Sequence, residues 1–558
     1  MRGLQPDAAA PERPGTAGLE DKRPAGGRWL NWLVVTLPIL VELVVGGYRI
    51  NGPSFWRDEG YTITGSHRPV GAIFALVQHE DAFHGLYLLL MHPIIAVFGR
   101  SEIALRVPSL IAMSLAAGLT AALGMRLARA IGLSAAPAVG LIAGLLLAAL
   151  PVTTRYAQEG RPYAMVMLFA VFTTYMLVVA AARGHWRWWA LYGTGLLLTG
   201  LFDLAAVLLA GTHGISLLLA RRGRRRDDVA TATATAAAAD DAAPREVSVT
   251  SADTLVPDAL RRWLATCAAV ALVISPVIVF SSLQSAQLDW VQPPNFDAVF
   301  GLLQDCAGAS SLIAVAAVLA TLGSIAGGGL QRGRGLTPSI ICLPWFVLPP
   351  ALLLTVSLLH PLYVERYILF CLPGLVILES FGLVWLVNRT RRFVSRWSTR
   401  RAAVLSFVPS AAIAALIVIL LIGPQAWIRR PDDRADDLRT IARVLATHER
   451  PGDAILYLPR KTAVIGTAYR DGFGKLPDIG LQTGPVVSDT LLGTAALPRV
   501  VAARLRGVRR VWVVEWVHPL APDSVPPPDL LRLLTPARMG GSWLIRSIFL
   551  VLYLMPSR

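Results

Sequence analysis

Two adjacent carboxylates, Asp58 and Glu59, follow closely on the first long apolar segment of the chain. Near lipid a carboxylate loses contacts with water and its charged form becomes costly, so such a pair usually has a partner. That partner can be a metal ion, a basic side chain or a proton that moves in a reaction. A carboxylate such as Asp58 can take the proton from an attacking hydroxyl group, which is general-base catalysis.

Two further polar clusters, residues 155–163 and residues 360–367, lie beside apolar segments. Arginine keeps its charge near lipid and matches phosphate oxygens with paired N–H groups, so it suits a phosphate leaving group. Tyrosine can stack on a sugar ring or anchor at the lipid headgroups. Acid and amide oxygens suit a divalent cation, although no spacing indicates a particular metal. The candidates for binding a substrate that carries such a phosphate group are Arg161, Tyr363 and Arg366. Gln158 and Glu159 form a second acidic motif after Asp58 and Glu59.

Composition predicts a membrane protein with many spans. Of the 558 residues 54% are apolar, and the mean hydropathy is +0.55. These values exclude an ordinary soluble globular protein, and the length allows about ten spans plus a further domain. The formal net charge of +16 comes mostly from arginines in short loops, which is a topology signal. We therefore expect membrane lipids, and no nucleic acid, among its partners.

Apolar stretches of about 20 residues predict eleven membrane spans. Segment 186–220 counts as two short helices that turn near Phe202 and Asp203, and nine other stretches count once each. With the N-terminus in the cytoplasm, the arginine-rich loops all fall on the cytoplasmic side, as the positive-inside rule requires. The nine single stretches are 29–48, 103–127, 136–152, 162–182, 263–283, 309–329, 337–358, 367–388 and 403–424.

This count requires residues 69–99 to stay on the outer side of the membrane. The apolar run 86–98 is short and contains Pro93, which suits a helix that lies in the interface. A twelfth span is the alternative, and it would reverse the side of every later loop. In the favoured topology, residues 49–102 form one outer loop that carries Asp58.

Three segments lie outside the spans. Residues 1–28 are predicted to be a disordered cytoplasmic tail, and residues 221–262 a disordered cytoplasmic loop of low complexity. The spans form a membrane domain over residues 29–424, which includes the loop 221–262. Residues 425–558 alternate helical and strand-like patterns, which predicts a small α/β domain on the outer face. Its expected strands are 454–458, 510–516 and 548–554.

The sequence resembles the GT-C superfamily of polytopic glycosyltransferases, close to its protein O-mannosyltransferase-like branch in actinobacteria. The resemblance rests on the acidic pair after the first span, on the runs 81–87 and 98–109, and on the pattern at 147–163. This last pattern ends in Arg-Tyr-Ala-Gln-Glu-Gly-Arg-Pro-Tyr. The resemblance covers residues 30–180 well and the later spans by their layout.

The resemblance implies a polyprenyl-phosphate sugar as donor and the acid of the first outer loop as catalytic base. Asp58 is then the base, with Glu59 as its neighbour or the alternative, and His84 is the best histidine candidate for the donor site. Relatives often carry a second acidic motif after the third span, where this chain has Gln158 and Glu159. No cofactor is certain, and a divalent cation remains open.

Each candidate also has a structural explanation. The acidic pair could form an ion pair with Arg57 or be solvated in its loop. Glu159 could belong to a network with Arg155 or Arg161, and Arg366 could anchor the chain at the interface.

We therefore expect an α-helical polytopic enzyme of the plasma membrane with a GT-C-like fold. It would move a sugar, mannose in the first instance, from polyprenyl phosphate to a hydroxyl group of a glycan, lipid or protein, and direct attack would invert the anomeric carbon. A transporter or flippase for a lipid-linked sugar is the alternative. The polar groups gather on one face and the spans carry few charges, which favours an enzyme. A sensor or scaffold built on residues 425–558 is a third alternative.

Overall fold

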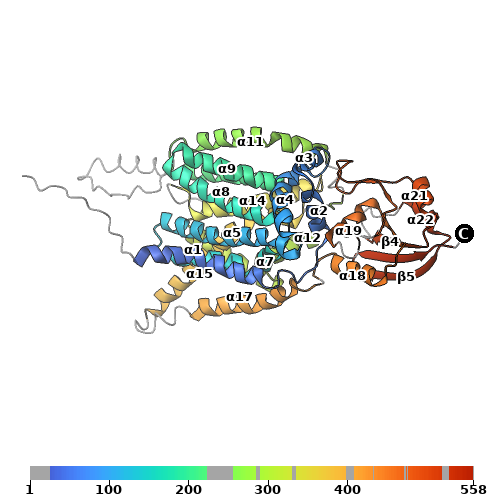
Figure 1. Ribbon diagram of the computed structural model, residues 1–558. Helices are drawn as coiled ribbons and strands as arrows, with labels where there is room; N and C mark the ends of the chain where they lie inside the picture. Colours follow the sequence, from blue (N-terminus) through green and yellow to red (C-terminus); the bar gives the residue numbers. More distant parts are fainter. Residues whose placement is uncertain are drawn as a thin grey trace, which may run out of the picture.

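The computed structural model is a helical bundle with a small sheet-containing region at one end (Figure 1). The predicted tail 1–28 lies outside the described residues except for its last three, and so do residues 223–254 of the predicted loop. The structure describes residues 26–222, 255–284, 290–329, 335–396, 408–431, 433–469, 473, 476–517 and 527–556.

Long apolar helices build the bundle, and neighbours in the chain pack against one another. The helices are α1 (Gly26–Gly47), α5 (Glu102–Ala130), α6 (Ala136–Ala149), α7 (Pro151–Ala157), α8 (Tyr163–Arg183), α9 (Trp186–Phe202), Leu204–Arg222 with η2 (Leu204–Val207), α11 (Ala259–Leu283), α12 (Phe296–Ala307), η4 (Ser310–Leu312), α13 (Ile313–Ala326), α14 (Pro338–Ser357), η5 (Glu365–Cys371), α15 (Leu372–Val394) and α17 (Val408–Trp427). Helices α1, α5 and α6 pack against one another, and the helix made of η5 and α15 is the most deeply buried of the long apolar ones.

Every apolar stretch predicted to span the membrane contains a helix. Seven described helices are long and apolar enough to cross, and the number rises to nine if each of two bent pairs is one span. These pairs bend by 66° between α6 and α7, and by 75° between α12 and the helix that ends with α13. The predicted turn at Phe202 and Asp203 is confirmed, since α9 ends at Phe202. The full count of eleven stays a prediction.

Residues 49–102, the predicted outer loop, fold into short helices rather than a twelfth long one. They are α2 (Arg57–Ser66), α3 (Val70–His79), η1 (Ala82–His84) and α4 (Gly85–Phe98). With 14 residues, α4 is about 21 Å long, which is shorter than the hydrocarbon core of about 30 Å. Its buried face includes Tyr87, Leu88 and Met91, so this helix packs into the protein.

A four-stranded sheet forms the core of the C-terminal region. The strand order is β1-β4-β6-β5, with β1 parallel to β4 and the other pairs antiparallel. The three predicted strands are confirmed at the same residues as β1, β4 and β6. The fourth, β5, contains two adjacent glycines, which hid its pattern. The elements are α18 (Leu438–His448), β1 (Ala454–Leu458), η6 (Arg460–Val464), α19 (Ile465–Ala468), β2 (Leu481–Thr483), β3 (Thr494–Ala495), α21 (Pro498–Leu505), β4 (Arg510–Trp516), α22 (Pro528–Leu534), β5 (Arg538–Ile545) and β6 (Ile548–Leu554).

The C-terminal region packs directly on helix α2 of the segment 49–102 (Figure 1). Arg57 of α2 donates to both carboxylate oxygens of Asp436, at 2.8 and 3.0 Å. The backbone N–H of Phe55 donates to the Tyr469 hydroxyl, which donates to Glu102 at 2.6 Å. One hydrophobic cluster continues from the bundle into the sheet. The sheet-containing region therefore fixes the start of α2.

Candidate active site

The acidic pair opens helix α2. Asp58 and Glu59 stand in its first turn, where the positive end of the helix dipole stabilises negative charge. The expected alternative partner, Arg57, is engaged by Asp436 instead. The two acids therefore find their partners elsewhere, and those partners differ.

Glu59 is buried in a network of hydrogen bonds. Its side chain is fully enclosed, and Arg106 of α5 donates to its two oxygens at 2.8 Å each. The backbone N–H of Gly160 also donates to it, at 2.9 Å. Arg106 donates further to the carbonyls of Ile50 and Pro53. These contacts give Glu59 a positioning role, since it ties α2 to α5 and to the turn before α8.

Asp58 faces a different partner. Its Oδ2 lies 3.6 Å from Nη2 of Arg366, and both side chains keep some exposure, 14% and 16%. The Arg366 guanidinium also lies within 6 Å of three aromatic rings, those of Trp56, Trp290 and Tyr367. Cation–π contacts of this kind orient a guanidinium without using its N–H groups. The structure thus brings together the first and third polar clusters.

Arg161 joins the second cluster to the same place. One of its terminal nitrogens lies 3.4 Å from the Asp58 carbonyl, and the other lies 2.6 Å from Nε2 of His84. Because arginine can only donate, His84 accepts at Nε2 and carries its proton on Nδ1, which faces Asp81 at 2.5 Å. Burial and the charge of Arg161 lower the pKa of His84. The imidazole is therefore neutral and held in one tautomer.

A cavity of about 710 Å³ is lined by His84, which contacts Arg161, and by Tyr367, whose ring lies beside the Arg366 guanidinium. Asp58, Arg161 and Arg366 do not themselves line it. His84, Tyr163, Asp203 and Tyr367 form polar parts of its wall, and most of the other lining residues are apolar. Burial raises the pKa of Asp203 to about 7. The apolar part of the wall comes mainly from the helix Leu204–Arg222 and from α14. Such a cavity suits a ligand with a long apolar chain and a polar head.

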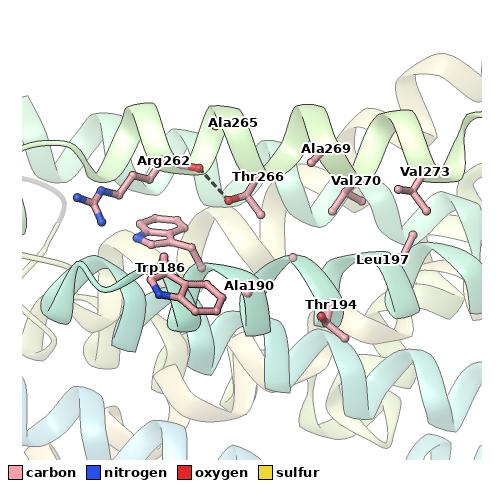
Figure 2. Close-up of a pocket in the computed structure, with 12 residues that line it drawn as sticks. Trp186, Ala190, Thr194, Leu197, Arg262, Ala265, Thr266, Ala269, Val270 and Val273 are labelled. Carbon is pink, nitrogen blue, oxygen red and sulfur yellow. Dashed lines mark hydrogen bonds between the residues drawn. The ribbon is translucent and has the colours of Figure 1, made fainter.

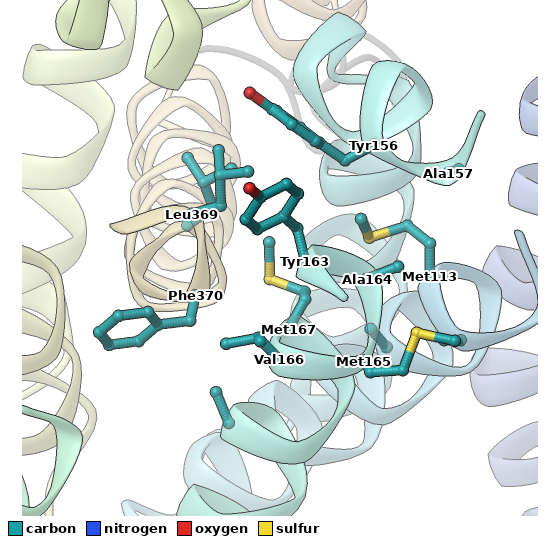
Figure 3. Close-up of a cluster of buried hydrophobic side chains, with 14 of the residues drawn as sticks. Met113, Tyr156, Ala157, Tyr163, Ala164, Met165, Val166, Met167, Leu369 and Phe370 are labelled. Carbon is teal, nitrogen blue, oxygen red and sulfur yellow. The ribbon is translucent and has the colours of Figure 1, made fainter. Parts of the chain in front are cut away.

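Packing of η5 against α8 sets this geometry (Figure 3). Leu369 and Phe370 of η5 face the first turns of α8, and all belong to the buried core. The rings of Tyr156 and Tyr163 meet edge to face, with centroids 5.3 Å apart. This core holds Arg366, at the start of η5, over the acidic turn of α2.

The second acidic motif makes supporting contacts. Gln158 donates to the carbonyls of Gly46 and Tyr48, at 2.7 and 2.9 Å. Glu159 lies 3.3 Å from Arg434 of the C-terminal region, and burial raises its pKa. The expected network is therefore present, but its arginine is neither Arg155 nor Arg161. Both residues tie the turn before α8 to neighbouring segments.

Tyr363 lies away from the cavity wall. Its hydroxyl is 3.5 Å from the carbonyl of Ala298, and its ring packs with Leu353 and Ile368. Tyr163 and Tyr367 line the cavity instead, and sequence reasoning did not select them. Both stood inside the polar clusters that it did select, whereas Asp203 stood in a predicted turn without any motif.

Among the described residues, no three His, Cys, Asp or Glu side chains lie together as a group that could hold a metal ion. Glu59 and Glu159 could supply oxygen ligands. Arg106 donates to both carboxylate oxygens of Glu59, whereas Arg434 contacts only Oε2 of Glu159 and the buried Oε1 has no hydrogen-bond partner in the part of the chain that the structure describes. The reaction proposed for this site uses no metal ion.

Comparison with known proteins agrees with this architecture. Residues 86–239 match the family described as Dolichyl-phosphate-mannose-protein mannosyltransferase. A comparison with curated protein sequences finds no significant match.

Solved structures share the fold at low sequence identity. ArnT from Cupriavidus metallidurans in the apo state is 14% identical with a TM-score of 0.56, over 95% of this chain and 98% of that one. ArnT bound to undecaprenyl phosphate is 15% identical with a TM-score of 0.54, over the same shares. The apo oligosaccharyltransferase of Archaeoglobus fulgidus is 10% identical with a TM-score of 0.51, over 88% and 70%. The family match and the shared fold together point to a membrane-embedded glycosyltransferase of the GT-C superfamily.

Proposed function

We propose that this protein transfers a sugar from a polyprenyl-phosphate donor to a hydroxyl acceptor, with mannose as the sugar. The observation that carries the proposal is the contact between Asp58 and Arg366 beside a cavity with a largely apolar wall. The donor is an isoprenoid chain with a charged head, and one structural neighbour was solved with undecaprenyl phosphate.

In the proposed reaction the acceptor oxygen attacks the anomeric carbon of the donor. The bond between that carbon and the phosphate oxygen breaks, and polyprenyl phosphate leaves with the electron pair. Asp58 takes the proton of the acceptor hydroxyl as the new bond forms. Arg366 stabilises the charge that develops on the phosphate. One direct displacement inverts the anomeric centre.

The neighbouring side chains support these two roles. Arg161 contacts the Asp58 carbonyl and His84, so it positions the start of α2 and adds positive charge near the phosphate. His84, Tyr163 and Tyr367 line the cavity and can bind the polar head of the donor. Fixed geometry between base, sugar and phosphate supplies much of the rate acceleration.

The proposed location is the outer face of the plasma membrane. The arginine-rich loops favour a cytoplasmic N-terminus, with the membrane domain over residues 29–424 and an extracytoplasmic domain over residues 425–558. Asp58 would then act outside the cell on a glycan, lipid or protein of the envelope. The family match favours this transfer chemistry over transport of a lipid-linked sugar.

The direct test uses the full-length protein in proteoliposomes with radiolabelled mannosyl polyprenyl phosphate. Lipid, glycan and protein fractions of the native cell envelope serve as acceptors. We expect label in one acceptor fraction, and NMR of the product should give the anomer opposite to that of the donor. Glucosyl polyprenyl phosphate tests the choice of sugar. Donor that crosses the bilayer unhydrolysed, with no label transferred, would overturn the proposal in favour of a flippase.

A further inference from the structure

A second cavity lies far from the acidic pair, in a groove between α9 and α11 on the outside of the bundle (Figure 2). Its volume is about 540 Å³, and it shares no lining residue with the larger cavity. Small residues form its floor, all of them exposed except the buried Gly193, and larger apolar ones close one end. The floor residues are Ala190, Gly193, Thr194, Ala265 and Ala269.

The helix that forms one wall of the groove lies largely exposed on the outside of the bundle. In the most apolar part of α11, only 6% of the residues are buried inside the protein. Gly193 of α9 lets the two helices pack closely at the groove, because a Cβ there would stand 2.8 Å from Thr266 of α11. A chain-like ligand in the groove would lie along this contact and add apolar surface to both helices.

The opposite end of the groove is basic and aromatic. Arg262 and Trp186 line it, and Arg262 donates to the carbonyl of Gly184. Arg183 and Arg187 lie next to it, each over the ring of Trp188. Residues 181–190 and 255–265 contain four arginines and only one acidic residue, an aspartate, and all five side chains are exposed. The residues are Arg183, Arg187, Arg261, Arg262 and Asp258.

Charge and shape together specify the ligand. Basic pockets between membrane helices bind anionic lipid headgroups, and tryptophan anchors at headgroup level. We propose that this groove binds a phospholipid with an anionic headgroup, its phosphate at Arg262 and one acyl chain along the small residues. The arginine end is the one that the positive-inside rule assigns to the cytoplasm, so the lipid comes from the inner leaflet.

The test measures lipid binding to the full-length protein in detergent by native mass spectrometry. The probes are phosphatidylglycerol and phosphatidylcholine with identical acyl chains. We expect phosphatidylglycerol to bind at least about tenfold more tightly. Arg262→Gln should weaken its binding about fivefold, the effect of one basic residue beside an anionic lipid. Because Arg262 also donates to Gly184, Arg187→Gln serves as a second variant with the same expected direction.

Shape is tested by filling the groove. Ala269→Leu should weaken phosphatidylglycerol binding about tenfold, whereas Ala268→Leu, an exposed neighbour that does not line the groove, should leave it unchanged. Arg392→Gln on α15, on the other side of the bundle, controls for charge (Figure 1). Equal affinities for the two lipids, or an unaffected Ala269→Leu, would overturn the proposal. Displacement of phosphatidylglycerol from the groove by polyprenyl phosphate would also overturn it.

Discussion

At the contact between α2 and α5, Glu59 accepts three hydrogen bonds at 2.8 to 2.9 Å and has no exposure to solvent. One residue earlier, Asp58 has a longer contact of 3.6 Å with a single guanidinium group and remains partly exposed. A fully satisfied charge holds a structure together, whereas an incompletely satisfied one can change partner. Adjacent acids thus acquire different roles from their surroundings.

The same contrast holds for the arginines. Arg106 is fully buried, and its N–H groups donate to Glu59 and to backbone carbonyls. Arg366 lies among aromatic rings, and its charged partner is Asp58 of α2. A phosphate group can replace a carboxylate at such a guanidinium with paired hydrogen bonds. The contact between Arg366 and Asp58 is therefore suited to binding a ligand, and the buried contact between Arg106 and Glu59 is suited to holding the helices in place.

Removing the buried acid should have the largest effect on stability. Glu59→Ala leaves Arg106 charged and unpaired in the interior, so we expect a loss of about 3–5 kcal/mol in the free energy of unfolding. Thermal unfolding in detergent would measure it. Asp529→Ala is the matched control, because its ion pair with Arg532 is exposed and should contribute less than about 1 kcal/mol. Equal losses of stability in the two variants would show that Glu59 contributes no more than an exposed ion pair does.

A smaller effect, on binding alone, is expected at the contact between Arg366 and Asp58. Arg366→Gln should weaken binding of the polyprenyl-phosphate donor about 10- to 100-fold, which corresponds to about 1.5–3 kcal/mol. The melting temperature should change little. Arg430→Gln provides the control, since Arg430 also lies over a tryptophan ring, that of Trp427, but is exposed. Donor titrations that give the same affinity for both variants would speak against Arg366 as the phosphate ligand.

The smallest expected effect is a pH dependence from Asp203. Its pKa of about 7 means that the carboxyl is neutral below that pH and charged above it. A carboxylate in the cavity wall repels phosphate, so the KM for the donor should rise up to about tenfold between pH 6 and pH 8. Asp203→Asn should flatten this profile while keeping the hydrogen bond from the Ala205 N–H. A profile that is unchanged in the variant would exclude Asp203 as its source.

The free energy of unfolding should also depend on pH through Asp203, and it should decrease as the pH rises. The folded pKa of Asp203 is about 7 and the ordinary value is 3.8, so the folded protein binds more protons between these pH values. Its contribution to the free energy of unfolding is therefore largest below this window and decreases as the pH rises through it. Asp203→Asn should reduce the fall in melting temperature between pH 5 and pH 8.

The helices and three strands were predictable because their signals are local. Apolar length marks the helices, and the alternating runs at 454–458, 510–516 and 548–554 mark strands. The convergence of Asp58, Arg161 and Arg366 followed from topology, since their loops were expected on one side of the membrane. Each of these inferences depends only on the order of apolar and polar residues along the sequence.

The partners of the candidate residues were not predictable. Arg106 lies inside an apolar helix, 47 positions from Glu59, and no sequence spacing links them. Arg434 and Asp436 reach the site only because the sheet-containing region packs on the first loop. Asp203 is a single acid in a turn, and its importance comes from the cavity that it lines.

The central claim, that Asp58 is the base and Glu59 its support, is tested most directly by Asp58→Asn. Single-turnover transfer would be measured with saturating labelled donor, together with donor affinity and melting temperature. We predict a rate about 10²- to 10⁴-fold below that of the unaltered protein, with donor affinity and melting temperature nearly unchanged. A transfer rate within tenfold of the unaltered protein, with the donor fully bound, would contradict the account.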